Sequence, residues 1–169
     1  MKYFSFFFLL LFFSSCEEKP VMSSIAPVNW KSRAAELPLD DSLSTGTTYL
    51  SIYSQIYSRS ELRTHNLTAT VSMRNTNVND SIFVLKADYY NTKGHLIRTY
   101  FKNPIVLMPM ETVEIVIDES DQEGGTGANF IFDWKKPESA DDPFFEGVMI
   151  STSGQQGISF TTHGRKLRK

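Results

Sequence analysis

The chain has 169 residues, of which 41% are apolar, and its 17 Lys and Arg against 19 Asp and Glu leave a formal net charge of −2. This size and composition are typical of one ordinary globular domain. A single cysteine excludes a disulfide framework and any zinc site built from several thiolates, and the balanced charge gives no electrostatic basis for binding nucleic acid.

The first fifteen residues have the pattern of a secretory signal peptide. Lys2 precedes an apolar run from Tyr3 to Phe13, and two serines then lead directly to Cys16. The run is shorter than the roughly 20 residues that cross a membrane as a helix. The peptide resembles a bacterial lipoprotein signal, in which the cysteine becomes the first mature residue and carries acyl chains. We therefore expect residues 1–15 to be removed, Cys16 to be lipidated, and the protein to be an outer-membrane lipoprotein of the bacterial cell envelope, facing either the periplasm or the cell surface.

Residues 16–46 are predicted to form a tether between the lipid and the domain. The stretch contains three prolines and several serines, and its apolar residues follow no sustained period. Trp30 is the unusual residue here, because an indole is compatible either with docking on the edge of the domain or with a place in the free tether.

From residue 47 onward, apolar and polar residues alternate in short segments separated by turn residues, which predicts β-strands. The expected strands are residues 49–57, 67–74, 83–90, 95–101, a short segment between Pro104 and Met108, and residues 112–118, 128–134, 146–152 and 157–162. The segments 67–74, 83–90 and 95–101 are expected to form a meander, with the reversal at Asn91–Gly94 supplying residues that tolerate positive φ.

No segment after the signal places apolar residues at helical spacing for three turns. Seven to nine short strands separated by turns predict an all-β fold, specifically an antiparallel immunoglobulin-like β-sandwich over residues 47–164. Residues 165–169 are predicted to be an exposed basic tail.

Several blocks of this sequence resemble one known family. In order they are Tyr53–Tyr57, Asn66–Asn75, Asp88–Tyr90, Glu119–Asp121, Gly124–Phe130 and Gln155–Phe160. Together they resemble the uncharacterised bacterial family named domain of unknown function 3124, whose members are largely small secreted proteins or lipoproteins. The resemblance spans roughly residues 43–164. It implies no assigned substrate and no catalytic residue.

The loop 118–127 combines clustered carboxylates with three glycines. Its acidic residues are Asp118, Glu119, Asp121 and Glu123. Clustered oxygen ligands on a loop suit Ca²⁺, although the spacing does not match an EF-hand. The alternatives are a solvated turn and a ligand held by backbone amides near Gly124, Gly125, Gly127 and Asn129.

The polar loop 151–157 is a second candidate site. Gln155 and Gln156 can bind sugars or peptides through hydrogen bonds, and the same residues can equally cap a hairpin. Tyrosines along the strands can offer a stacking platform for carbohydrate, or they can pack in the core.

Catalytic chemistry is poorly supported by the sequence. His65, His95 and His163 lie on different predicted segments, no metal-binding or nucleophile motif surrounds them, and lipidation would consume the only thiol. We therefore predict no catalytic residues and a non-catalytic binding module for an envelope protein or a glycan. One alternative is a calcium-dependent or small-ligand-sensing module that uses loop 118–127. Another is a hydrolase with a spatially assembled site. No cofactor is expected unless the acidic loop binds Ca²⁺.

Overall fold

The computed structural model describes residues 28–38, 43–152 and 157–168. The strands are β1 (Leu43–Ile52), β2 (Gln55–Ser58), β3 (Ser60–Asn66), β4 (Thr68–Arg74), β5 (Ile82–Tyr90), β6 (Leu96–Thr99), β7 (Ile105–Leu107), β8 (Thr112–Ile117), β9 (Ala128–Pro137), β10 (Phe144–Ser151), β11 (Ile158–His163) and β12 (Arg165–Lys166). Two short 3-10 turns, η2 (Trp30–Arg33) and η3 (Gly125–Gly127), complete the regular elements of these ranges. Within the same ranges, no helix is long and apolar enough to cross a membrane.

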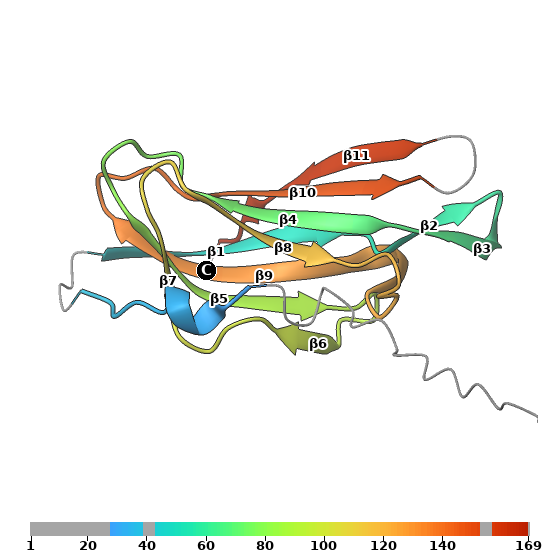
Figure 1. Ribbon diagram of the computed structural model, residues 1–169, viewed down its shortest axis with the longest axis horizontal. Helices are drawn as coiled ribbons and strands as arrows, with labels where there is room; N and C mark the ends of the chain where they lie inside the picture. Colours follow the sequence, from blue (N-terminus) through green and yellow to red (C-terminus); the bar gives the residue numbers. More distant parts are fainter. Residues whose placement is uncertain (1–27, 39–42, 153–156, 169) are drawn as a thin grey trace, which may run out of the picture.

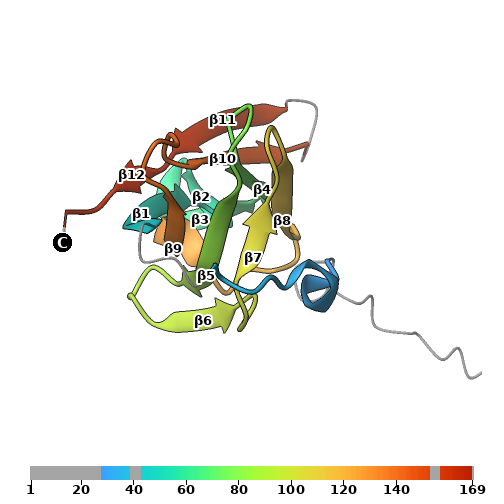
Figure 2. The ribbon, with the colours of Figure 1, turned by 90° about the vertical axis from the view of Figure 1, so that its left-hand side faces the viewer.

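Two antiparallel sheets pack together as a sandwich (Figure 1). The larger sheet has the order β12-β1-β9-β5-β6, with β7 also paired to β5, and the smaller sheet has the order β11-β10-β4-β8. The hairpin β2–β3 forms a separate pair that projects from one end. Figure 2 shows the chain leaving β11 to form β12 beside β1, so one stretch of chain links the edges of both sheets. The predicted all-β class and antiparallel sandwich architecture are confirmed.

The hydrophobic core lies between the two sheets. Alternation turns Leu50 of β1 and both Val71 and Met73 of β4 inward, and all three side chains are fully buried. Aromatic rings join the layers, since Phe132 of β9 stacks on Phe145 of β10 with ring centroids 4.2 Å apart. Burial of these side chains supplies the main favourable free energy of folding.

The residues of β5 that face the core are not all the ones that strict alternation predicts. The pattern placed four residues on one side, namely Phe83, Leu85, Ala87 and Tyr89. In the structure, the register of β5 against β9 skips Leu85, which is the extra residue of a β-bulge. The residues that face the core therefore change from even to odd numbers at the bulge. Ile82 and Val84 are buried before it, and Ala87 and Tyr89 are buried after it. The prediction was right only for the second half of the strand.

The strands predicted as one meander divide between the two sheets. β5 and β6 form the expected hairpin, but β4 lies in the other sheet, between β10 and β8. The meander was wrong for β4 because alternation defines the faces of a strand and not its neighbours. The connection 75–81 therefore crosses from one sheet to the other.

The ordered domain is larger at both ends than the predicted range 47–164. β1 begins at Leu43, inside the predicted tether, and β12 lies inside the predicted basic tail, where Lys166 pairs with Thr48. The start of β1 resembles a linker because it is rich in small polar residues. Gly46 is needed there, since a Cβ at this position would lie 2.1 Å from the Trp134 ring.

Residues 28–38 pack against the domain. The Trp30 ring lies 5.1 Å from the Phe101 ring and 6.4 Å from the Tyr100 ring, measured between centroids. Further along, Ala34 forms an isolated bridge with Ile105 of β7. Of the two alternatives for Trp30, the structure therefore favours docking on the domain edge.

Candidate functional site

The acidic loop 118–127 does not gather its carboxylates into one group. The Asp118 side chain is hydrogen-bonded within its own loop, where its Oδ1 accepts hydrogen bonds from N and Oγ of Ser120 at 2.9 and 2.7 Å. Glu119 is exposed, whereas the Asp121 side chain is fully buried. In the part of the chain that the structure describes, no three His, Cys, Asp or Glu side chains are placed to hold a metal ion. The predicted ligand set is thus divided among different surroundings.

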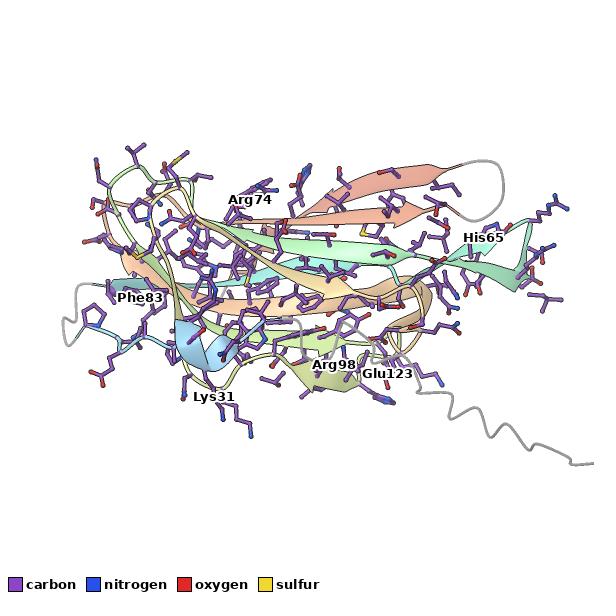
Figure 3. The ribbon with its side chains drawn as sticks, in the orientation of Figure 1. Lys31, His65, Arg74, Phe83, Arg98 and Glu123 are labelled. Atoms are coloured by element: carbon purple, nitrogen blue, oxygen red, sulfur yellow. The ribbon has the colours of Figure 1, made fainter. Side chains whose placement is uncertain are left out.

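Arg98 of β6 provides the countercharge for the buried end of this loop. Its Nη1 lies 3.1 Å from Oδ2 of Asp121, and its Nη2 lies 3.4 Å from Oε2 of Glu123. The same Nη1 donates a hydrogen bond to the Tyr100 hydroxyl at 3.0 Å. Figure 3 shows Arg98 and Glu123 close together on this face. The Arg98 guanidinium therefore supplies a positive charge beside two of the four carboxylates that were considered as Ca²⁺ ligands.

Arg98 and the two buried tyrosines near it keep their usual charges at neutral pH. Burial acts to lower the pKa of Arg98, but the hydrogen bond with Tyr100 and the charge of Asp121 outweigh it, so the pKa is raised. Burial raises the pKa of Tyr100 to about 12, although Arg98 acts in the opposite direction. Burial also raises the pKa of Tyr89. Neither tyrosine is therefore suited to act as a phenolate base near neutral pH.

The glycines of the loop allow close approach of the neighbouring turn. A Cβ at Gly124 would lie 2.0 Å from the Tyr89 hydroxyl. Thr92, in the β5–β6 turn, donates hydrogen bonds from N and Oγ1 to the Gly124 carbonyl at 3.0 Å each, and its Oγ1 accepts one from Gly127 N at 2.9 Å. Gly125 adopts a φ of 73°. The Gly127 amide, one of the backbone groups that were candidates for holding a ligand, therefore donates its hydrogen bond within the domain.

Of the other candidate residues, one lies in the part of the chain that the structure describes. Asn129 lies in β9, opposite Ser51 of β1 and Tyr90 of β5. Gln155, Gln156 and Cys16 lie outside the described residues.

The three histidines lie on separate elements. His65 belongs to β3, on the projecting hairpin (Figure 3). His95 follows the β5–β6 turn, and His163 ends β11, with its Nε2 3.6 Å from Oε1 of Glu146. In the described sheets, β3 pairs with β2 and β11 pairs with β10, so no strand pairing brings two of these histidines side by side.

A denser polar network lies at the opposite end of the sandwich, where three connections between the sheets meet (Figure 1). We call residues 75–81, 108–111 and 138–142 the loop cluster. Asn75 is buried at its centre, and its Nδ2 contacts the carbonyl oxygens of Asp80, Leu107 and Met108 at 2.7, 3.0 and 3.1 Å. Its Oδ1 accepts hydrogen bonds from N and Nδ2 of Asn77, both at 2.9 Å.

Asn77 and Lys136 join the third connection to this network. Oδ1 of Asn77 accepts a hydrogen bond from Asp141 N at 2.7 Å, and its Nδ2 donates to Asp141 O at 3.1 Å. The buried Lys136 ammonium donates to the carbonyls of Ala140 and Glu138. Buried side-chain amides therefore hold all three loops in fixed positions.

The loop cluster presents three exposed apolar side chains, which we call the apolar patch. Val78 is 74% exposed, Met108 is 53% exposed and Met110 is 67% exposed. Met110 has a φ of 61° and follows Pro109 in a turn closed by a hydrogen bond from Glu111 N to Met108 O at 3.0 Å. Glycine is favoured at such a position, so the methionine is held there against a conformational cost.

The N-terminal segment is tied to the same cluster. Oε2 of Glu111 accepts a hydrogen bond from Met108 N at 2.8 Å, while its Oε1 pairs with Arg33 at 2.9 Å. Residues 28–31 and 99–103 also enclose a groove of about 450 Å³, whose aromatic walls are Trp30, Tyr100 and Phe101. The groove is within the size range of small-ligand sites.

Sequence reasoning missed the apolar patch and the network beneath it. In the sequence, Asn75 and Asn77 lie between two predicted strands, and Met108 only marks the end of a short one. The available signal was Met-Pro-Met within a turn, where polar residues are usual. The long-range partners of Asn75 left no pattern in the sequence.

Comparison with known proteins places the chain in a family. The model of the family described as "Protein of unknown function (DUF3124)" matches residues 45–167. No curated protein matches the chain. A solved structure, "Crystal Structure of Thermotoga maritima 1070", is similar with a TM-score of 0.45 and 7% identity, covering 71% of this chain and 92% of that one. Because the family model covers most of its length, the chain belongs to the DUF3124 family.

Proposed function

We propose that this protein is a non-catalytic binding module of the bacterial cell envelope, held there through lipid on Cys16, and that it binds a partner protein at the apolar patch. The signal-like pattern of residues 1–16 supports the location. We further propose an immunoglobulin-like arrangement, in which loops gathered at one end of a sandwich carry the binding residues.

The observation that carries this proposal is the combination of exposed apolar side chains with rigid loops. Single exposed apolar residues are common, but Val78, Met108 and Met110 lie on neighbouring loops of one cluster. Met side chains adapt their shape to a partner. Because the Asn75 network already orders the backbone beneath them, binding would cost little further conformational entropy.

The charges around the patch indicate the chemistry of the partner. Exposed or half-exposed carboxylates lie on the same loops, at Asp80, Glu138 and Asp141. The Lys136 ammonium, in contrast, is directed to backbone carbonyls inside the cluster. A partner surface with an apolar centre and a basic rim would complement this arrangement.

Photo-crosslinking in the envelope tests the proposal. The full-length protein is produced with Val78→p-benzoylphenylalanine, and a matched variant carries the same group at the exposed Lys93, in the β5–β6 turn. We expect a discrete protein adduct from position 78 and none of that size from position 93. Equal adducts from both positions, or none from position 78, would contradict the proposal.

A glycan partner is a second candidate, favoured by the groove of about 450 Å³ beside Trp30. Partly exposed indole rings stack on sugar faces, and Lys31 and Lys102 also line this groove and can donate hydrogen bonds. Titration of soluble envelope glycan fragments, followed by Trp fluorescence, should show saturable binding that Trp30→Ala abolishes and Val78→Ser leaves unchanged. An unchanged fluorescence throughout would remove this candidate.

A further inference from the structure

Most edges of the two sheets carry features that prevent pairing with another chain. In the larger sheet, β12 has only two residues and both are cationic, and the edge at β7 is occupied by the bridge between Ala34 and Ile105. In the smaller sheet, β8 carries the exposed Glu114. Short length, charge and coverage are the usual ways in which proteins protect strand edges.

The other edge of the smaller sheet, β11, has none of these features. It is six residues long, pairs with β10 in a register without a shift, and contains no proline and no Lys, Arg, Asp or Glu. Among the described strands, none pairs with its outer side. An antiparallel strand directs half of its backbone N–H and C=O groups to each side, so β11 presents unpaired groups at this edge.

The side chains of this strand are apolar or hydroxyl-bearing up to His163 at its end, whose Nε2 lies 3.6 Å from Oε1 of Glu146. Ile158 and Ile150 of the β10–β11 hairpin are both exposed, and Phe160 packs against Tyr53 at 5.8 Å between ring centroids. Figure 1 shows β11 beside β10 at the outer side of the smaller sheet. Burying the side chains beside these unpaired backbone groups therefore costs little free energy of desolvation.

We infer that two copies of this chain associate through their β11 edges. Antiparallel pairing of β11 with itself about a two-fold axis joins two four-stranded sheets into one of eight strands. A second copy fits this edge because pairing about a two-fold axis satisfies the same backbone groups on both chains. Two β11 edges also meet without like charges, whereas two β12 edges would bring Arg165 and Lys166 of one copy close to Arg165 and Lys166 of the other.

Thr161 is the position at which this pairing can be opposed. It lies near the middle of β11 and its side chain is exposed. With the axis at Phe160 or Thr161, it faces Ser159 or Thr161 of the second copy. Two lysines at this site would approach each other across the new pair, and like charges there are destabilising.

The experiment measures the protein mass of the full-length chain in detergent micelles by size-exclusion chromatography with light scattering. We expect the mass of two chains for the wild type, and the mass of one chain for Thr161→Lys at the same concentration, reflecting a rise in dissociation constant of roughly tenfold or more. Thr112→Lys, an exposed threonine on the other edge strand β8, should keep the mass of two chains.

Circular dichroism of both variants confirms that each is folded. A single-chain mass for the wild type up to about 100 µM protein, or a two-chain mass for folded Thr161→Lys, would overturn the inference. The inference is independent of the apolar patch, so Val78→Ser should leave the mass of two chains unchanged.

Discussion

Met110 and Arg59 are the two described non-glycine residues with positive φ, at 61° and 65°. Each lies in a tight turn, and each carries a conformational cost that glycine would not. Met110→Gly should therefore raise the free energy of unfolding by about 1 kcal/mol and the thermal midpoint by a few degrees. Arg59→Gly should do the same at the β2–β3 turn.

Thermal unfolding followed by circular dichroism measures both shifts. A lower midpoint for Met110→Gly would mean that the Met110 side chain stabilises the isolated domain, which would weaken the case that it is kept for a partner.

Asp121 and Glu123 both pair with Arg98, but only Asp121 is fully buried. Removing its charge leaves the guanidinium without its buried partner, so Asp121→Asn should lower the free energy of unfolding by about 2 kcal/mol. Glu123→Gln changes an exposed partner and should cost less than about 0.5 kcal/mol. Urea unfolding measures both values, and equal losses would contradict the distinction.

Arg98 also bears on metal binding by the acidic loop. Since its guanidinium supplies the positive charge beside Asp121 and Glu123, millimolar Ca²⁺ followed by chelator should leave the thermal midpoint unchanged. A ligand that binds only the folded state would raise the midpoint by mass action. A rise of several degrees with Ca²⁺ would therefore show that the loop forms a metal site after all.

At the scale of elements, the connections between the sheets depend on Asn75. Its side chain contacts the Asp80 carbonyl within the β4–β5 loop, and it joins this loop to the end of β7 and the β7–β8 loop through the carbonyl oxygens of Leu107 and Met108. Asn75→Ala should lower the free energy of unfolding by about 3 kcal/mol, because buried carbonyls lose their donor. The neighbouring exposed Thr76 serves as the control, and Thr76→Ala should change stability by less than about 0.5 kcal/mol. Similar losses in the two variants would contradict the proposed role of the network.

Strand periodicity predicted the elements better than their arrangement. β4, β8 and β9 were expected where they occur, because one buried face leaves a period of two in the sequence. The bulge at Leu85 and the separation of β4 from β5 were not predictable, since both depend on pairing partners. The start of β1 was missed because Gly46 is required by the bulky Trp134 opposite it, a contact far away in sequence.

At the scale of the molecule, the two ends of the sandwich have different properties. One end carries the acidic loop, whose charged and glycine residues bind Arg98 and Thr92 within the domain. The other end carries the loop cluster, whose buried asparagines support exposed apolar side chains. Composition singled out the first end as a candidate site. The second depends on contacts that span the chain, so only the structure revealed it.

The central claim is that the apolar patch binds a partner protein, and one measurement tests it most directly. Full-length protein carrying Val78→p-benzoylphenylalanine is crosslinked in the envelope with Met110→Gly or with Arg59→Gly added. We predict that the adduct is lost with Met110→Gly, although this variant folds more stably, and is retained with Arg59→Gly. An adduct of equal yield in both variants would contradict the claim.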